Sequence, residues 1–420
     1  MAGPPLSLYV HLPWCVRKCP YCDFNSYTGG DDASRRRYLD ALCRDLESEA
    51  RRADDRPLVS IFLGGGTPSL FRADEIARLL DASRSQLAWA DDIEITMEAN
   101  PGGVEHDDFR GYRDAGVNRL SVGAQSFDPG QLATLGRVHG VEDIALAARE
   151  AAEAGFDNVN IDLMYALPGQ DVAGALSDIE AAASLQPTHL SWYQLTLEPN
   201  TVFHARPPGN LPDGDLAFAI QQAGEARLAE LGFERYEVSA YARDQRRCRH
   251  NLNYWSFGDY LAVGAGAHGK LSTPAGVVRY RKSANPMQYM KQIEGGAERA
   301  TTERVSDNDL LFEFMLNALR LVDGFDEALF VERTRLPLPA LRARLAPLSK
   351  RGLIAGAGGG RWRPTRKGQQ FLNDLQAHFL PDGGAATQTG SGQFIHIASR
   401  TPIFSVSEAS EFTLSVEKGR

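Results

Sequence analysis

Disulfide bonds are nearly excluded by the cysteine content, which is five residues in a chain of 420. Cys43 and Cys248 stand far from each other and from the other three cysteines, so the spacing does not describe a disulfide framework. A chain with this cysteine usage is typical of a reducing compartment. We therefore expect a cytoplasmic protein.

Long apolar runs are also missing. No stretch approaches the roughly 18 consecutive apolar residues of a membrane-spanning helix, and the first residues have neither the basic start nor the apolar centre of a signal peptide. A basic excess is missing as well, because 54 acidic residues outweigh 45 basic ones and give a formal net charge of −9. This balance does not fit a surface built for nucleic acid. We expect no stable membrane anchor and no nucleic-acid partner.

The remaining three cysteines lie together after a short apolar segment, at the spacing CxxxCxxC: Cys15, Cys19 and Cys22. No fourth cysteine follows nearby. Three thiolates on one loop can hold three irons of a 4Fe-4S cubane and leave the last iron without a protein ligand. An open iron can bind the amino and carboxylate groups of S-adenosylmethionine, and the reduced cluster can cleave that molecule to an adenosyl radical. We expect Tyr21 to pack beside the cluster or the adenine.

Two simpler interpretations of the cysteine loop exist. A structural zinc ion takes four closed ligands, and His11 is the one nearby residue that could complete such a set. The loop could also be buried and hold no metal. The sequence favours the iron-sulfur cluster because of the polar segments that accompany it further along the chain.

The first 240 residues alternate short apolar runs with longer helical patterns, which is typical of βα units around a parallel sheet. The length alone suggests about three domains. The six expected strands are residues 8–11, 59–63, 93–98, 119–125, 159–163 and 190–195. The clearest expected helices between and after them are residues 34–52, 73–87, 142–154 and 215–231.

Polar, glycine and proline residues follow each expected strand. After the cysteine loop come the segments GGGTPS (64–69), EANPG (98–102), GAQSF (123–127), the run from Asp162 to ALPG (166–169), and EPN (198–200). Any one of them fits an ordinary turn. Because the carboxyl ends of barrel strands meet at one rim, the whole series favours a ligand site there.

Several residues of this rim have the chemistry that S-adenosylmethionine requires. The glycines 64–66 let backbone approach a ligand closely, and their carbonyls and amides could hold its amino group. Glu98, Gln125, Arg137 and Asp162 supply acceptors for ribose hydroxyls, a counter-charge for the sulfonium and a cationic fork for a carboxylate.

The pattern changes beyond about residue 295. Expected helices at 307–321, 327–335 and 339–350 precede a glycine-rich turn (356–360), a basic strand pair (361–366) and a helix (367–379), an order that suggests a small winged-helix-like domain. Its basic residues could contact phosphates, although a solvated face is the preferred interpretation. They are Lys350, Arg351, Arg361, Arg363, Arg366 and Lys367. From residue 382 the composition predicts a flexible tail. The expected domains are therefore 1–294, 295–381 and 382–420.

The quoted motifs resemble one family. The segment SLYVHLPWC (7–15), with GGGTPS, EANP, SVGAQSF, GRVH and NIDLMYALPGQ, is similar to the radical SAM family of oxygen-independent coproporphyrinogen III dehydrogenase and its sibling heme chaperones. The match covers about residues 7–378. It implies a partial six-stranded (βα) barrel of the α/β class with a small C-terminal helical domain. It also implies that S-adenosylmethionine lies among Tyr9, Gly65, Gly66, Thr67, Glu98, Gln125, Arg137 and Asp162.

Three features favour the heme chaperone branch of this family. The dehydrogenases carry a further cysteine where this chain has Phe24, and they carry a long segment before the cluster, where this chain has 14 residues. The run His250 to Trp255 also resembles the HNxxYW element of heme chaperones. His250 could be an axial ligand of heme iron, with Tyr254 and Trp255 against the macrocycle.

Simpler interpretations of this second site are equally consistent with the sequence. His250 could cap a loop and the two aromatic residues could be core. Cys248 could react with heme or simply pack. The glycine-rich segment 264–269, which contains His268, could line the same cavity or form a tight loop.

The resemblance implies a protein that binds a 4Fe-4S cluster, S-adenosylmethionine and heme, and that delivers heme to acceptor hemoproteins such as those of respiration. An electron donor and a second copy of the chain are the other expected partners. Whether S-adenosylmethionine is cleaved is left open by the sequence. The alternative is oxidative decarboxylation of coproporphyrinogen III, and a third is a regulator whose basic C-terminal end binds nucleic acid.

Overall fold

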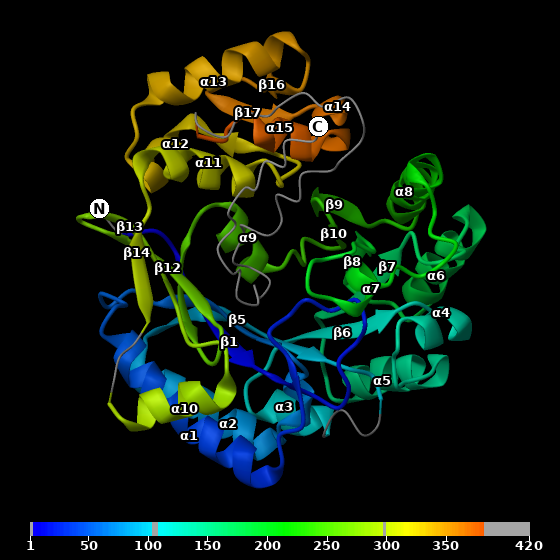
Figure 1. Ribbon diagram of the computed structural model, residues 1–420, viewed down its shortest axis with the longest axis vertical. Helices are drawn as coiled ribbons and strands as arrows, with labels where there is room; N and C mark the ends of the chain where they lie inside the picture. Colours follow the sequence, from blue (N-terminus) through cyan, green and yellow to red (C-terminus); the bar gives the residue numbers. More distant parts are fainter. Residues whose placement is uncertain (1–2, 103–107, 297–299, 382–420) are drawn as a thin grey trace, which may run out of the picture.

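One open sheet organises the structure, a computed structural model that describes residues 3–102, 108–296 and 300–381. The sheet has twelve strands in the order β14-β13-β12-β11-β1-β4-β5-β6-β7-β8-β10-β9 (Figure 1). The described residues contain no helix that is both long and apolar enough to cross a membrane.

The six strands expected from the sequence are adjacent and parallel in chain order. They are β1 (Leu6–Leu12), β4 (Leu58–Gly65), β5 (Trp89–Ala99), β6 (Arg119–Gln125), β7 (Val159–Tyr165) and β8 (His189–Gln194). All six carboxyl ends therefore lie along one edge of the sheet. The expected α/β fold is confirmed. The sheet does not close on itself, which is compatible with the expected partial barrel.

The connecting helices begin at carboxylate caps. Asp31, Asp171 and Asp213 accept a hydrogen bond from a backbone amide three residues on, which satisfies a free amide at each helix start. The principal helices are α1 (Asp32–Ala50), α2 (Ala73–Gln86), α3 (Phe109–Asp114), α5 (Val141–Glu153), α6 (Val172–Ser184) and α8 (Gly214–Glu230). They lie along the outer side of the sheet (Figure 1).

The two faces of the sheet differ in polarity. In β1, Leu8 and Val10 belong to the apolar core shared with α1 and α2. The alternate residues Ser7, Tyr9 and His11 point to the other side, where the Ser7 hydroxyl lies 2.8 Å from that of Ser60. Because side chains alternate along a strand, one face packs the helices and the other forms a polar interior.

The sequence did not predict the strands at the two edges of the sheet. Strand β11 (Asp259–Val263) pairs parallel with β1, and the hairpin of β12 (His268–Thr273) and β13 (Gly276–Arg281) follows it. Strand β14 (Thr301–Arg304) adds to this edge, so residues beyond the predicted boundary at 294 still belong to the main sheet. The other edge ends in β10 (Ala240–Ala242) and β9 (Glu234–Glu237).

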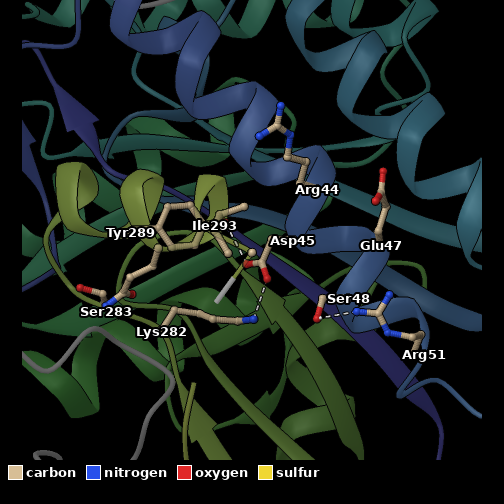
Figure 2. Close-up of a pocket in the computed structure, with 11 residues that line it drawn as sticks. Arg44, Asp45, Glu47, Ser48, Arg51, Lys282, Ser283, Tyr289 and Ile293 are labelled. Atoms are coloured by element: carbon tan, nitrogen blue, oxygen red, sulfur yellow. Dashed lines mark hydrogen bonds and ion pairs between the residues drawn. The ribbon is translucent and has the colours of Figure 1, made fainter. Parts of the chain in front are cut away.

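A buried ionic cluster attaches the hairpin to α1. The Lys282 ammonium lies 2.7 Å from carboxylate oxygens of both Asp45 and Glu49. The Tyr289 hydroxyl, on α10 (Pro286–Glu294), donates to Asp45 at 2.8 Å. Figure 2 shows Asp45, Lys282 and Tyr289 in the wall of a pocket of about 230 Å³ between α1 and α10. Each charge is paired, so the cluster has a structural explanation.

The C-terminal region has its own core, in which Phe314 packs edge-on against Phe325 and Phe330. Its helices are α11 (Asp307–Ala318), α12 (Glu327–Thr334), α13 (Leu338–Lys350), α14 (Arg366–Gln370) and α15 (Leu372–Ala377). Its small sheet has β15 (Phe325–Asp326), β16 (Ile354–Gly356) and β17 (Arg361–Pro364). The expected helix 367–379 is interrupted at Phe371, which leaves the helical backbone conformation at φ −111° and ψ 44°.

This order of helices and strands matches the expected winged-helix-like arrangement. In the basic cluster, Arg361 pairs with Asp326 at 3.0 Å, which fits the solvated-face interpretation for that residue. The division into these three domains remains a prediction. The expected tail, 382–420, lies outside the described residues.

Packing of α8 on the sheet gives a test of the fold. A Cβ added at Gly224 would lie 2.0 Å from the Trp192 indole, so Gly224→Ala should lower the free energy of unfolding by about 1–3 kcal/mol. A Cβ added at Gly214, the first residue of the same helix, would meet no atom within 4 Å. Urea unfolding should show Gly214→Ala within about 0.5 kcal/mol of wild type. Equal stability of the two variants would contradict this packing.

Candidate cluster and cofactor site

The cysteine loop leaves the carboxyl end of β1. Its first residues form β2 (Trp14–Cys15), which pairs with β3 (Tyr27–Thr28) on the far side of the loop. Cys15, Cys19 and Cys22 are thiols, half-buried on the same loop. The three thiols are thus close to the surface, on the loop that follows the carboxyl end of β1.

The geometry differs from that of a single-ion site. Among the described residues, no three His, Cys, Asp or Glu side chains converge as ligands of one metal ion. His11, the residue considered for a zinc site, has both ring nitrogens engaged, with the Tyr9 hydroxyl at 3.1 Å and the Asn25 carbonyl at 2.9 Å. A cubane requires a different arrangement of ligands, because each thiolate binds a separate iron at its own corner of the cluster.

The electrostatics of the loop fit a cationic metal centre. Burial is the largest of the causes that raise the pKa of the Cys22 thiol to about 12, and the neighbouring Cys15 and Cys19 contribute to this rise. Without a metal this thiol is therefore protonated at neutral pH. Three thiolates in so small a space need compensating positive charge, which iron ions would supply.

The glycine loop after β4 fits tightly against β1 and the cysteine loop. Gly65 has a φ of +115°, and a Cβ there would lie 2.4 Å from the His11 ring. The amides of Gly66 and Thr67 donate to the carbonyls of Leu12 and Trp14 at 2.8 and 2.7 Å. The Gly65 amide donates to Glu98 at 3.1 Å.

The amides of Gly65, Gly66 and Thr67 are thus engaged within the protein. Their backbone carbonyl oxygens are the better candidates for ligand contacts, and the assignment of Gly65, Gly66 and Thr67 to the S-adenosylmethionine site remains a prediction. The short helix η1 (Pro68–Leu70) follows and turns the chain away from the rim.

Arg137 joins three of the rim segments. It follows α4 (Pro129–Thr134), and its guanidinium donates to the Asn100 side chain at 2.6 Å and to the Gly123 carbonyl at 3.0 Å. Another of its nitrogens lies 3.6 Å from the Cys19 sulfur. The positive charge of Arg137 also acts on Tyr21. The structure thus brings Arg137 next to Cys19 and Tyr21 of the cysteine loop. The contacts of Arg137 and Tyr21 with a cofactor remain a prediction.

Two buried carboxyl groups, Glu98 on β5 and Asp162 on β7, lie in the interior near the rim. Burial, and then the charge of Asp162, raise the pKa of Glu98 to about 8. Burial also raises the pKa of Asp162, although Ser121 and Asn160 donate to its oxygens at 3.1 and 2.8 Å. A cationic ligand or hydroxyl donors would relieve this repulsion, which is the chemistry of a sulfonium nucleoside.

Gln125 ends β6 in the left-handed region, with a φ of +71°. Its side-chain oxygen accepts a hydrogen bond from the Tyr193 hydroxyl at 2.7 Å. Sequence reasoning did not single out Tyr193 or Asn100. The period-two alternation of β8 could have identified Tyr193, since His189, Ser191 and Tyr193 must share one face.

His250 lies deeper in the interior, on α9 (Arg249–Trp255), which sits between the sheet and the C-terminal helices (Figure 1). The side chain is only 1% exposed. Its Nδ1 lies 3.0 Å from the Ser60 hydroxyl, and its Nε2 is buried without a hydrogen-bond partner. The ring packs against Phe62 and Tyr254 at 5.1 and 4.7 Å. Burial lowers the pKa of His250 to about 3, so the imidazole is neutral.

Tyr9 connects the two predicted sites. Its ring centre lies 6.0 Å from that of His11 and 6.5 Å from that of His250. The rim residues and His250 are therefore separated by one aromatic ring, although they are far apart in sequence.

The other residues considered with His250 behave as structural residues. Cys248 is fully buried, with its sulfur 3.6 Å from Glu94, and burial raises its thiol pKa to about 12. The segment 264–269 forms the tight turn before β12 and the first two residues of that strand, and the Ala267 amide donates to the Gly264 carbonyl at 3.1 Å. Its Ala265 carbonyl accepts from the Asn25 side chain, so this segment packs beside the cysteine loop.

Comparison with known proteins agrees with this architecture. The family model of the Radical SAM superfamily matches residues 9–181, and that of the HemN C-terminal domain matches residues 305–371. The solved structure of coproporphyrinogen III oxidase (HemN) from Escherichia coli, described as a radical SAM enzyme, is similar over 90% of both chains, with a TM-score of 0.76 and 25% identity.

The chain is thus a radical SAM superfamily protein with a HemN-type C-terminal domain. Heme chaperone HemW from Haemophilus influenzae and from Escherichia coli are each 44% identical to it, over 90% of this chain and 99% of theirs. Heme chaperone HemW from Bacillus subtilis is 32% identical over 89% of this chain. The chain belongs to the heme chaperone HemW family.

The Glu98–Asp162 pair gives a pH-dependent prediction for the apoprotein. The Glu98 pKa is about 8 in the folded state, above its ordinary value near 4.5, so folding takes up a proton between these pH values. The unfolding free energy contributed by Glu98 therefore falls as pH rises from about 4.5 to about 8. The Glu98→Gln side chain does not titrate, so this variant does not lose that contribution. The free energy of unfolding of the variant, relative to that of wild type, should therefore increase across that pH range. Denaturant unfolding of metal-free protein at several pH values measures it; a constant difference would contradict a buried acidic Glu98.

Proposed function

We propose that this protein is a cytoplasmic heme chaperone that binds a 4Fe-4S cluster, S-adenosylmethionine and heme, and that it delivers heme to acceptor hemoproteins. The observation that carries the proposal is the combination of the three-thiol loop with two buried carboxyl groups, Glu98 and Asp162, in a chain 44% identical to heme chaperone HemW over 90% of its length. Family membership supports the delivery of heme, and the geometry supports the cofactors.

Different residues of the site would bind the cluster and the different parts of S-adenosylmethionine. Cys15, Cys19 and Cys22 would hold the cluster, which, when bound, supplies an electron and an open iron for S-adenosylmethionine. Glu98 and Asp162 would face the positive sulfonium and the ribose hydroxyls. Arg137 holds the Asn100 and Gly123 segments against the cysteine loop, and its charge suits the ligand carboxylate. Gln125 and Tyr193 would border the nucleoside.

His250 remains our proposed heme ligand, and the structure adds a condition to that proposal. The unpartnered Nε2 is the atom that iron would take, because an unsatisfied buried nitrogen is costly. An imidazole that is 1% exposed cannot meet a macrocycle directly. Heme binding through His250 therefore requires α9 to move away from β1 and β4.

The cluster assignment is tested by anaerobic reconstitution with iron and sulfide. Cys19→Ser should lose the visible absorption of the cluster, because two thiolates cannot hold a cubane at three corners. Cys43→Ser removes a half-buried thiol on α1, outside the loop, and should keep the absorption. Retention of a complete cluster in Cys19→Ser would refute the assignment.

The heme function is tested by hemin titration and by transfer to an apo-hemoprotein. His250→Gln keeps a hydrogen-bonding side chain opposite Ser60 but lacks the imidazole, and should weaken heme binding by at least about tenfold, or about 1.4 kcal/mol. His378→Gln changes an exposed histidine in the C-terminal region and should bind normally. Unchanged affinity in His250→Gln would remove His250 as the ligand.

The same preparation decides between the two branches of the family. Coproporphyrinogen III is incubated anaerobically with the loaded protein, a reductant and S-adenosylmethionine. We expect no protoporphyrinogen, together with heme transfer to the acceptor. Protoporphyrinogen formation without heme transfer would replace our proposal with the dehydrogenase activity.

A further inference from the structure

Three segments meet around the exposed side of the cysteine loop. The Arg17 guanidinium donates to the backbone carbonyls of Gly136 and Arg137, which ties the loop to the turn after α4. The Phe203 amide, on the short helix α7 (Val202–Ala205), donates to the Pro20 carbonyl at 2.9 Å. We call the surface formed by residues 15–20, 136–139 and 201–206 the loop surface.

Each of the three segments exposes a valine. Val16, Val138 and Val202 are 41%, 45% and 59% exposed. Among the described residues, eight large apolar side chains are exposed, so three of the eight belong to these short segments. Solvent-exposed apolar side chains beside a functional loop are typical of a surface that a protein partner covers.

The charges of the loop surface are all positive. Residues 15–20, 136–139 and 201–206 contain no aspartate or glutamate, in a chain with 54 such residues. Arg17, Lys18 and Arg206 are exposed. Lys18 donates to the carbonyls of Phe24 and Ser26 at 3.0 and 3.3 Å. Within the described part of the chain, neither Arg17 nor Lys18 forms an ion pair with a carboxylate. The Arg17 guanidinium is held by backbone carbonyls, and the Lys18 charge acts on the nearby Asp23. Both positive charges are exposed and can act on a partner.

Acidic groups lie beside this surface. Asp23 follows the cysteine loop and is half-buried, and the charge of Glu198 acts on it. Glu142 and Asp143 follow the segment 136–139 at the start of α5. The loop surface itself is basic and apolar, although the chain as a whole carries a net charge of −9. A partner that recognises it should be acidic with an apolar centre, because complementary charge steers association.

We propose that the loop surface is the docking site of an acidic one-electron carrier protein. This inference rests on the proposed function, which requires the cluster to be reduced. The carrier, a reduced flavoprotein or iron-sulfur protein of low potential, gives up one electron and is oxidised by one unit, and the cluster takes up that electron. Docking here brings the carrier against residues that lie between and beside Cys15 and Cys19, so the electron travels a short path.

The experiment compares two reductants on the reconstituted full-length protein. An acidic flavodoxin in its hydroquinone form must dock before it transfers an electron, whereas dithionite is small and needs no protein surface. Stopped-flow loss of the visible cluster absorption gives both rates. Binding of oxidised flavodoxin to the loaded protein, measured by calorimetry, gives a readout independent of electron transfer.

The test variant changes α7 and leaves the cysteine loop intact. Val202→Ser with Arg206→Glu should slow reduction by flavodoxin about tenfold at low ionic strength and weaken flavodoxin binding. The difference should shrink as salt is added, since salt screens exposed charges. Reduction by dithionite should not change. A second variant, Arg17→Glu, should act in the same direction if its cluster absorption is normal.

The matched control reverses charge on a distant surface. Arg363→Glu with Arg366→Glu alters two exposed arginines of the C-terminal region, and the cluster of this variant should be reduced at the wild-type rate by both reductants.

Equal rates of reduction by flavodoxin in the α7 variant and wild type would overturn the proposal, as would equal slowing in the control. Loss of heme transfer to an apo-hemoprotein, with normal flavodoxin reduction, would assign this surface to the acceptor instead. In either case cluster reconstitution and hemin titration would still test the proposed function separately.

Discussion

The polar interior of the sheet is the constraint on which the rest of this structure depends. Ser7, Tyr9 and His11 alternate with Leu6, Leu8 and Val10 along one strand, so β1 is buried on both faces but apolar on only one. Buried polar groups need partners. The contacts Ser7–Ser60 and Tyr9–His11–Asn25 supply them inside the protein, and they fix β1 relative to β4 and the cysteine loop.

Helix α9 completes this hydrogen bonding at the inner end of the interior. The Asn253 amide donates to the Ser7 hydroxyl at 2.9 Å. Glu94 accepts from the backbone amides of Arg249 and His250 at 3.1 and 3.2 Å. Glu98 lies four residues further along the same strand and accepts from one amide, that of Gly65. The inner carboxylate is satisfied by the fold, whereas the outer one still needs a cation or a donor. This difference is why we propose a structural role for Glu94 and a ligand-binding role for Glu98.

The sequence predicted those parts of the molecule that local patterns determine. Strand ends at residues 98, 125 and 163 predicted the rim, because parallel strands place their carboxyl ends on one edge. The edge hairpin was missed, although the segment TPAG between Thr273 and Gly276 is a recognisable turn signal. The burial of His250 could not be read from HNLNYW, because its partners Ser60 and Phe62 lie some 190 residues earlier. The internal use of the Gly65 to Thr67 amides depends on the same kind of distant contact.

The column of rings from His11 through Tyr9 to His250 limits how the two proposed sites can influence each other. Burial lowers the pKa of His11 to about 4 and that of His250 to about 3, and it raises the pKa of Tyr9. All three rings are therefore neutral near pH 7. A ligand at Glu98 changes charge on one side of Tyr9, and the Tyr9 ring can respond only by moving or by exchanging hydrogen bonds. Since Tyr9 packs against His250, any influence of cofactor binding on α9 would be transmitted by packing and not by titration of the column.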